Sequence, residues 1–335
     1  MLLTILSLLG SIALVFISSI LFINVLEWLA HHLKLGSSFV GAIVSPLFTS
    51  LPELIVILIA IFSKMGETGP AIGIGTIFGE PLMASSLSYG LVGFAVIIGY
   101  LTKKRASATM VIDRTLSLPY IVIIVLFPLT LIPGFVHLSW VRFFFGFFFL
   151  TAFVVYISLM YRKRMAELIE KSEELIFTRI VPESDYSEKI ASAAQILVAV
   201  GLLYFGSRYL VSSVANIAQG INISPLGLAM IVIPAATAIP ETITAVIWGH
   251  KGQDTLSIGS LVGEKVLYST FYPALGLFLT SWVLDIHAVF SVIVTTVISL
   301  ILLYSILKRR LPWYALFLGF ILFVVYGILV FVFRV

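Results

Sequence analysis

The sequence predicts an all-α integral membrane protein with ten transmembrane helices, arranged as two inverted repeats of five helices each. Three observations predict this fold. Apolar residues make up 60% of the 335 residues, charged residues only 11%, and the mean hydropathy is +1.15, whereas soluble domains are about 45–50% apolar and about 25% charged. Long apolar runs recur along the chain, and a motif that ends in glutamate occurs in two of them.

Each predicted helix is an apolar run of about 20 residues or more, the length needed to cross a bilayer. The runs are continuous and do not alternate, so a membrane β-barrel is not expected. The first run lacks a basic segment before it and is too long for a signal peptide, so we expect it to be a spanning helix. The predicted spans are residues 3–23, 37–63, 72–100, 108–132, 138–160, 190–215, 224–249, 256–282, 287–307 and 312–333.

Basic residues in the loops predict the orientation of these spans. When the loops are assigned alternately to the two sides, fourteen lysines and arginines fall on one side and two on the other. Because cytoplasmic loops carry the excess of basic residues, the first side is predicted to be cytoplasmic and both termini to be outside, in a cell membrane. The fourteen are Lys34, Lys103, Lys104, Arg105, Arg162, Lys163, Arg164, Lys171, Arg179, Lys189, Lys251, Lys308, Arg309 and Arg310, and the two are Lys64 and Arg334.

Residues 161–189 form a long polar connector between a first repeat, 1–160, and a second repeat, 190–335. Apolar residues at roughly helical spacing predict a short amphipathic helix at the cytoplasmic membrane surface, followed by a turn near Pro182. We interpret the connector as a linker. Because five spans is an odd number, the second repeat must be inserted upside down relative to the first, and inverted repeats that meet near the midplane are typical of transporters.

Two matched segments carry a glutamate in the middle of an apolar span. Residues 39–53 read FVGAIVSPLFTSLPE and residues 227–241 read GLAMIVIPAATAIPE, so that Glu53 aligns with Glu241, 188 positions later. A carboxylate at this depth costs at least about 2.5–3.5 kcal/mol on the insertion scale. A relic of duplication would keep only packing, whereas the matched residues here are Pro, Thr and Glu, which are costly in lipid. This choice of residues favours a duplicated ion site.

A second pair of matched segments follows the first. Residues 75–80 read GTIFGE and residues 259–264 read GSLVGE, so that Glu80 aligns with Glu264. The two glycines of each copy are four residues apart and permit close approach of a neighbouring helix. In the first copy, they are expected to press Glu80 against the span that carries Glu53.

Prolines in the first pair of segments are expected to interrupt the helices, because proline lacks an N–H and clashes with the carbonyl four residues before it. Pro52 is expected to free the carbonyl of Phe48, and Pro240 that of Ala236. Irregular backbone at membrane depth is tolerated only where it is buried or lines a cavity. Freed carbonyls, hydroxyls and carboxylates are hard oxygen ligands, of which calcium takes about 6–8.

A hydroxyl residue precedes each of the four carboxylates by four positions, a spacing that places both side chains on one helix face. The pairs are Thr49 with Glu53, Thr76 with Glu80, Thr237 with Glu241, and Ser260 with Glu264. These eight residues are candidate ligands of a transported metal ion. Four carboxylates in a dry cavity cannot all be ionised without a bound cation, so we expect protons to compete with the metal ion.

The four segments resemble the α-repeats of the cation/calcium exchanger superfamily, which includes sodium/calcium and proton/calcium exchangers. Those repeats read G-T-S-L-P-E, followed by G-N-x-x-G-S-x-x-x-N or D. Residues 48–53 (FTSLPE) and 236–241 (ATAIPE) are similar to the first signature, and residues 75–84 (GTIFGEPLMA) and 259–268 (GSLVGEKVLY) to the second. The resemblance implies cation exchange and ligand roles for the residues at matching positions. Those residues are Thr49, Ser50, Glu53, Thr237 and Glu241.

The chain departs from the family pattern at several of these positions. Ala238 replaces a serine, and Glu80 and Glu264 stand where the family usually has serine. Ala84 and Tyr268 stand where it usually has asparagine or aspartate, and the asparagine of G-N is a hydroxyl residue in both copies. The resemblance therefore implies a site that has lost amide ligands and gained two carboxylates.

We therefore expect a secondary antiporter that exchanges a divalent cation, with calcium as the leading candidate, against protons or sodium by alternating access. Sodium stays open as the counter-ion because it also prefers oxygen ligands. The alternatives are an antiporter of the same fold for Mg, Mn, Na or K, and a passive channel, which would carry a linear ohmic current instead of saturable counter-transport. The expected partners are the lipid bilayer and small cations, without a cofactor. The oligomeric state stays open, a homo-oligomer included.

An enzyme is not expected. A metal-dependent intramembrane hydrolase would need a histidine pair such as H-E-x-x-H, and His250 is the only histidine at the end of a matched span. No G-x-S-x-G indicates a serine nucleophile, and no P-loop supports ATP-driven pumping. Cysteine is absent, which excludes thiolate metal sites. No basic run is interleaved with aromatic residues, so nucleic-acid binding is not indicated.

Two further basic residues lie inside predicted spans. Lys265 follows Glu264 and either offsets the negative charge of the site or faces a neighbouring helix, because adjacent residues on a helix do not face each other. Arg208 either extends toward the outer membrane surface or acts as a fixed counter-ion.

Overall fold

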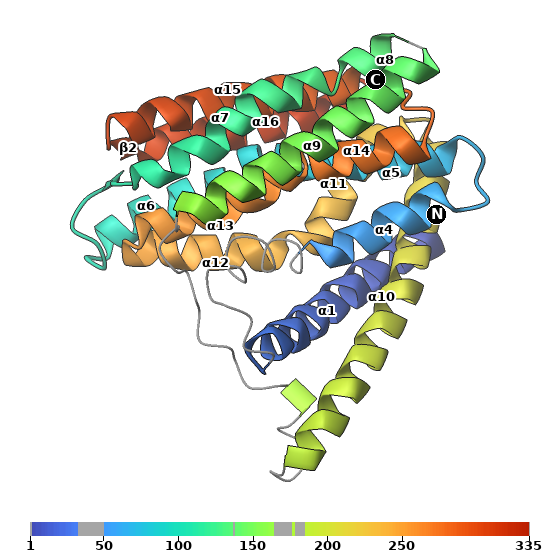
Figure 1. The fold of residues 1–335 in the computed structure, drawn as a ribbon, viewed down its shortest axis with the longest axis horizontal. Helices are drawn as coiled ribbons and strands as arrows, with labels where there is room; N and C mark the ends of the chain where they lie inside the picture. Colours follow the sequence, from blue (N-terminus) through green and yellow to red (C-terminus); the bar gives the residue numbers. More distant parts are fainter. Residues whose placement is uncertain (1, 33–49, 137, 164–175, 178–184, 335) are drawn as a thin grey trace.

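The computed structural model describes residues 2–32, 50–136, 138–163, 176–177 and 185–334. These residues are predominantly helical, and most of the helices run roughly side by side (Figure 1). The α-helices are α1 (Leu2–His32), α4 (Leu51–Ile61), α5 (Thr68–Met83), α6 (Tyr89–Leu101), α7 (Ser117–Leu129), α8 (Ile132–Phe135), α9 (Ser139–Lys163), α10 (Asp185–Ile221), α11 (Pro225–Thr237), α12 (Ile239–Lys251), α13 (Asp254–Leu267), α14 (Phe271–Leu279), α15 (Ile286–Leu307) and α16 (Trp313–Phe331). The shorter elements are the π-helical turn η2 (Ala84–Ser88), the 3-10 turn η3 (Arg114–Leu116), and the strands β1 (Thr109–Met110) and β2 (Leu311–Pro312).

Seven helical segments of the described chain are long and apolar enough to cross a membrane. They are Leu3–Val25, Thr68–Leu101, Arg114–Phe135, Ser139–Met160, Ile190–Ile221, Ile286–Leu307 and Trp313–Phe331. Of the predicted span 37–63, residues 50–63 are described, and α4 is the helix that they contain. The prediction of a helical membrane protein is thus confirmed, whereas the count of ten spans and the inversion of the repeats stay predictions.

Two predicted spans, 224–249 and 256–282, are each interrupted. α11 and α12 qualify as a span only when taken together, and they meet at a bend of 64°. Residues 268–270 separate α13 from α14. Pro273 lies in the first turn of α14, where its ring would clash with the preceding turn of a continuous helix. The break between α11 and α12 confirms the interruption expected from the prolines of that segment, whereas the break between α13 and α14 was not expected from the sequence.

The predicted span 108–132 becomes helical later than expected, at Arg114. β1 pairs antiparallel with β2, which begins after α15. Asp113 then caps the next turn, because its side chain accepts a hydrogen bond of 2.7 Å from the Thr115 N–H. The residues before Arg114 thus satisfy their polar groups outside a helix, and this short strand pair is a small departure from the all-α prediction.

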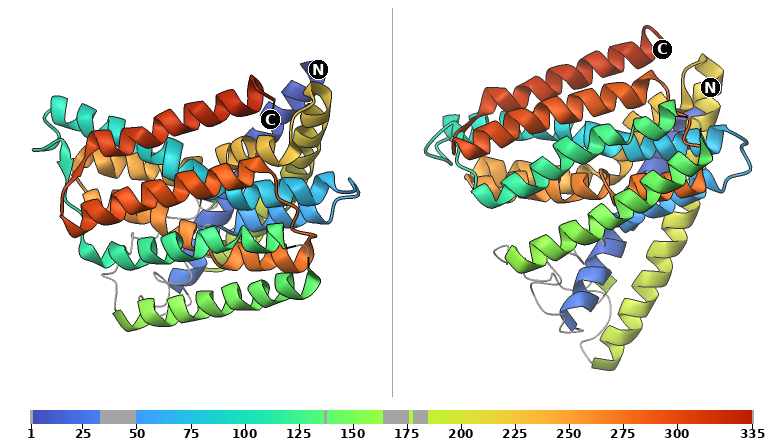
Figure 2. Two further views of the ribbon diagram at one scale, coloured as in Figure 1. Left: turned by 90° about the horizontal axis from the view of Figure 1, so that it is seen from above. Right: turned by 45° about the horizontal axis from the view of Figure 1, so that its top comes forward.

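α1 and α10 lie side by side and oblique to most of the other helices, as Figure 1 and Figure 2 show. Gln195 of α10 donates a hydrogen bond of 2.9 Å to the side chain of Asn24 on α1. The same two side chains accept hydrogen bonds from the backbone N–H groups of residues 176–177. This small described part of the connector is therefore attached to both repeats, while the predicted amphipathic helix lies outside the described residues.

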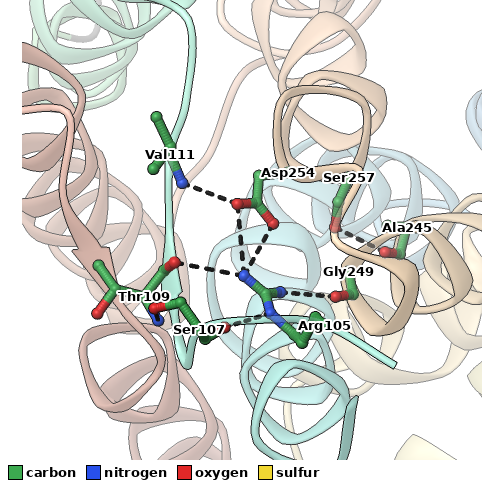
Figure 3. Close-up of polar contacts among 8 residues, drawn as sticks. All are labelled: Arg105, Ser107, Thr109, Val111, Ala245, Gly249, Asp254 and Ser257. Atoms are coloured by element: carbon green, nitrogen blue, oxygen red, sulfur yellow. Dashed lines mark hydrogen bonds and ion pairs between the residues drawn. The ribbon is translucent and has the colours of Figure 1, made fainter. Parts of the chain in front are cut away.

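Arg105 joins the two halves of the chain at the end of the bundle that carries the strands (Figure 3). Its guanidinium lies 3.1 Å from Asp254 Oδ1 and donates to three backbone carbonyls. Those carbonyls belong to Ser107, Thr109 and Gly249. Asp254 also accepts a hydrogen bond of 2.8 Å from the backbone N–H that follows β1. Arg105 was predicted as one of the basic loop residues, and it is a buried connection between the repeats.

α5 and α11 cross at very close range. A Cβ atom at Gly75 would lie 2.5 Å from the carbonyl oxygen of Leu226, and one at Gly79 would lie 2.6 Å from Met230 Cα. Side chains larger than hydrogen do not fit at these distances. The glycine pair of the first copy is thus confirmed as a motif for close helix approach.

The helix that meets this glycine pair is not the predicted one. α4 packs against a different face of α5, where a Cβ at Gly73 would lie 2.7 Å from a side-chain carbon of Ile61. Because each residue advances about 100° around a helix, Gly73 and Gly75 point in nearly opposite directions. The prediction that the pair presses Glu80 against the span of Glu53 is therefore wrong, since the pair faces the second half of the chain.

Replacing Gly79 with alanine is expected to lower the stability of the protein by about 1–3 kcal/mol, because the added methyl group forces two backbones apart. Thermal unfolding in detergent measures this effect. Gly201→Ala is the matched control, because a Cβ there meets nothing within 4 Å and alanine favours the helix. Equal unfolding midpoints for the two variants would contradict the close crossing of α5 and α11.

Candidate cation-binding site

The two matched P-E segments have the same local backbone conformation. Ser50 precedes α4 with φ −91° and ψ 4°, and its repeat partner Ala238 precedes α12 with φ −86° and ψ 0°. Each helix then has a proline at its start and a glutamate in its first turn. The duplication seen in the sequence is therefore also present in the local structure.

Pro52 and Pro240 each lie in the first turn of a helix, α4 and α12 respectively. A proline in the first turn costs no helical hydrogen bond, because the N–H groups there have no partner within the helix. The break lies before Pro240, where α11 ends at Thr237. The interruption predicted at the second P-E segment is therefore confirmed, whereas Phe48 and the other residues before Ser50 lie outside the described residues, so the interruption at Pro52 stays a prediction.

The backbone carbonyls of the residues that precede α4 and α12 accept hydrogen bonds. The carbonyl of Ser50 accepts from the backbone N–H of Leu54 at 3.1 Å and from the hydroxyl of Tyr272 at 2.6 Å. The carbonyl of Ala238 accepts from the N–H and the hydroxyl of Thr242 at 3.1 and 2.8 Å. Both carbonyls thus already have donors, and one of these donors is the hydroxyl of Tyr272, a residue of the other repeat that was not among the predicted site residues.

Glu53 and Glu241 lie in the first turns of α4 and α12. The free N–H groups and the dipole at a helix N-terminus favour negative charge there. Glu53 is 3% exposed, and its Oε2 atom has no hydrogen-bond partner among the described residues. An oxygen of this carboxylate is therefore held in the interior without a donor from the described part of the chain.

Glu80 of α5 and Thr237 of α11 connect the two repeats. The Thr237 hydroxyl lies 2.8 Å from Glu80 Oε1, and both side chains are buried. Thr76 lies one turn before Glu80 on the same helix, as its spacing predicted, and its hydroxyl donates to a backbone carbonyl of α5 at 3.0 Å. Thr237 and Glu241 do not share a helix face as predicted, because the bend between α11 and α12 separates them.

The four candidate carboxylates lie close enough together for the charge of one of them to interact with those of the other three. The charge of Glu53 interacts with those of Glu80, Glu241 and Glu264. In the part of the chain that the structure describes, however, no three side chains among His, Cys, Asp and Glu are arranged to hold a metal ion. The structure thus gathers carboxylates from both repeats without closing them around one ion position.

The remaining candidate residues occupy different environments. Ser260 shares α13 with Glu264, as predicted, and its hydroxyl donates to the carbonyl of Ser257 at 3.1 Å. Ser50 is buried at the break before α4. Thr49 lies outside the described residues.

Tyr268 and Tyr272 add two aromatic hydroxyls to the cluster. Their rings stack with centroids 4.4 Å apart, and both side chains are buried. Each hydroxyl interacts with the charges of Glu53, Glu80 and Glu264. The Tyr268 hydroxyl has no hydrogen-bond partner among the described residues. The only sequence signal for Tyr268 was its departure from the family's asparagine or aspartate, and Tyr272 had none.

Lys265 points away from the carboxylates, toward α6, α7 and α15. Its Nζ atom lies 3.3 Å from the Ser299 hydroxyl and 5.0 and 5.5 Å from the ring centroids of Tyr89 and Tyr120. The side chain is fully buried. Of the two interpretations drawn from the sequence, the structure favours the one in which Lys265 faces neighbouring helices.

Arg208 lies on an exposed part of α10. Its guanidinium lies 5.8 Å from the ring centroid of Tyr204, one turn earlier on the same helix. This position favours an arginine that extends along the protein surface over one that serves as a counter-ion in the interior.

The sequence profile of the sodium/calcium exchanger protein family matches residues 3–162 and 191–335. The chain belongs to the sodium/calcium exchanger family. Family membership agrees with the resemblance of the P-E and G-x-x-x-G-E segments to the cation/calcium exchanger superfamily. The gap between the two matched regions, residues 163–190, nearly coincides with the predicted connector.

Solved exchanger structures have the same fold as this chain. A crystal structure of an H+/Ca2+ exchanger superposes with a TM-score of 0.75 at 18% identity, covering 97% of this chain and 82% of that one. A sodium-calcium exchanger superposes with a TM-score of 0.57, also at 18% identity, covering 97% of both chains. An uncharacterised membrane protein of Methanocaldococcus jannaschii is 22% identical over 243 residues, which is 72% of this chain and 70% of that protein. The sodium/calcium exchanger fold thus extends over nearly the whole chain.

Proposed function

We propose that this member of the exchanger family is a secondary antiporter that exchanges Ca2+ against protons or sodium. The observation that carries the proposal is the group of four carboxylates in which the buried Glu53 and Glu80 lie close enough to the partly buried Glu241 and Glu264 for their charges to interact. Carboxylates are costly in an apolar membrane interior, so they are expected there only where they serve a function such as binding a cation that crosses the membrane. The names of the H+/Ca2+ and sodium-calcium exchangers of this fold support calcium as the cation and leave both counter-ions open.

The proposed ligands come from both repeats. They are Glu53, Glu80, Glu241, Glu264, Thr49, Ser50, Thr76, Thr237 and Ser260. The contact between Glu80 and Thr237 supports a site shared by the repeats, because a rearrangement of one repeat against the other would open or close it. In this proposal the repeats are inverted, the connector is cytoplasmic, both termini are outside, and the protein lies in a cell membrane.

The two extra carboxylates favour protons as the counter-ion. Four carboxylates around one divalent cation leave an excess of negative charge, and protonation removes that charge when the cation departs. A sodium-coupled cycle would instead fill the released positions with sodium ions, which also take oxygen ligands.

Flux measurements on the purified chain in liposomes test the proposal. With calcium outside and a pH gradient but no sodium, saturable calcium uptake accompanied by proton release is expected. Uptake that requires a sodium gradient and leaves the internal pH unchanged would contradict proton coupling. A linear ohmic calcium current without counter-transport would contradict exchange itself, and transport of Mg2+, Mn2+, Na+ or K+ in preference to Ca2+ would change the proposed substrate.

A further inference from the structure

A groove between α6 and α12 lies on the outside of the bundle, apart from the four carboxylates. Its volume is about 830 Å3, within the range of about 300–1,000 Å3 typical of small-molecule sites. The residues that line its walls include Leu91, Phe94 and Ile98 on α6, and Ile243, Val246 and Ile247 on α12. Several of these apolar side chains are about half exposed, as expected for a surface that faces the acyl chains of a bilayer.

The groove has the length of one membrane leaflet. Its lining on α12 begins at Ile239 and ends at Lys251. Twelve steps of 1.5 Å along a helix correspond to about 18 Å, whereas the hydrocarbon core of a bilayer is about 30 Å thick. An acyl chain of one leaflet therefore matches the groove in length as well as in polarity.

At the end of the groove beside the bend between α11 and α12, the described lining residues offer no free polar group to a ligand. Ser88 and Thr242 line this end, and their hydroxyls are hydrogen-bonded to each other at 2.7 Å. The remaining lining there is apolar, from Met83 and Pro234 to Ala238. A ligand that reaches this point must present hydrocarbon to it.

The opposite end of the groove, at the end of α12, is basic. His250 and the exposed Lys251 line it. Lys103 and the next residue, a lysine too, follow α6 at the same end, where a Cβ at Gly99 would lie 2.4 Å from the carbonyl oxygen of His250. The acidic side chain closest in sequence, Asp254, is already paired with a buried arginine. Among the described residues, these basic side chains have no ion-pair partner, and they stand where a lipid headgroup of that leaflet would lie.

We propose that this groove binds an anionic glycerophospholipid, with an acyl chain between α6 and α12 and its phosphate beside Lys251. Apolar area along the walls supplies affinity for the chain, and a basic residue near a membrane surface attracts an anionic headgroup. The bound chain ends beside the bend between α11 and α12. The lipid therefore supports the helix that carries Glu241 in its first turn.

Lipid titration of the purified full-length protein in neutral detergent tests this proposal. Dioleoylphosphatidylglycerol is expected to raise the midpoint of thermal unfolding at lower concentration than dioleoylphosphatidylcholine does. Lys251→Gln is expected to weaken the phosphatidylglycerol effect about fivefold, as for the loss of one interfacial charge. Ile243→Trp, which fills the groove, is expected to remove most of the effect of both lipids.

Lys308→Gln is the matched control, because Lys308 is an exposed lysine that follows α15 just before β2, the strand paired with β1 after α6, and it does not line the groove. Its response to phosphatidylglycerol should equal that of the unmodified protein. The proposal is overturned if the two lipids act alike, if Lys251→Gln responds as Lys308→Gln does, or if soluble glycerol phosphate produces the whole effect. The amount of lipid retained in native mass spectra, which does not depend on stability, gives a second readout for any variant that folds poorly.

Discussion

Glu53→Gln is expected to lower calcium flux in proteoliposomes at least about 100-fold, which corresponds to about 2.8 kcal/mol. Glutamine keeps the shape of the side chain and removes its charge. Because Glu53 is buried and lies in range of the other three carboxylates, it is the residue whose neutralisation most directly weakens cation binding. The fold should persist, because removing one of several neighbouring negative charges relieves repulsion.

Glu67→Gln is the control for this experiment, because Glu67 is an exposed residue between α4 and α5. It should transport calcium as the unmodified protein does. If Glu53→Gln folds normally and retains full calcium flux, the site is not at these carboxylates. Calcium binding measured at several pH values for Glu53→Gln and Glu80→Gln separates a ligand, whose loss weakens binding at all pH values, from a residue that mainly carries protons.

Arg105→Ala is expected to lower the free energy of unfolding by about 3–5 kcal/mol, the cost of leaving one partner of a buried ion pair alone. The variant also removes the donor for three backbone carbonyls that come from both halves of the chain. Unfolding in mixed detergent micelles measures the change. Lys104→Ala, at the exposed position beside it, should change the free energy by less than about 0.5 kcal/mol.

The double variant Arg105→Ala/Asp254→Ala tests the pair itself. Its loss should be smaller than the sum of the two single losses, because the second change removes the stranded carboxylate. Additive losses would show that the two residues act independently.

The loss caused by Arg105→Ala should also depend on pH. Burial raises the pKa of the Asp254 carboxyl, while the Val111 N–H and Arg105 act in the opposite direction. With a folded pKa above the unfolded value, the contribution of this group to stability is present below the ordinary aspartate pKa and is lost as pH rises through the raised value. Without Arg105, the carboxyl binds a proton more readily, so the deficit of Arg105→Ala should shrink on acidification.

The four glutamates were predictable as candidate site residues because each breaks the rule that charges avoid apolar spans. The duplicated order of proline, threonine and glutamate was enough to pair Glu53 with Glu241 and Glu80 with Glu264. The same reasoning placed the helices correctly where they are continuous, since apolar length alone sets a span.

Contacts between distant segments could not be predicted in the same way. The glycines at 75 and 79 indicated a close helix crossing, but not which helix crosses there, because small residues specify distance and not identity. Tyr272 had no signal at all, since a tyrosine in an apolar run is also ordinary core packing. Its hydrogen bond to the carbonyl of Ser50 exists only because folding brings the first turn of α14 to the residue that precedes α4.

The sequence by itself determined the class of this protein, because transfer of apolar residues from water and the high cost of intramembrane carboxylates act locally and leave a readable pattern. Only the tertiary structure decided that α5 packs against α11 and that Arg105 pairs with Asp254. The same holds for the packing of Lys265 near the rings of Tyr89 and Tyr120. These pairings depend on which helix faces meet after folding. Many helices offer an apolar or small-residue face of similar energy, and the choice among them is made by the packing of the whole bundle.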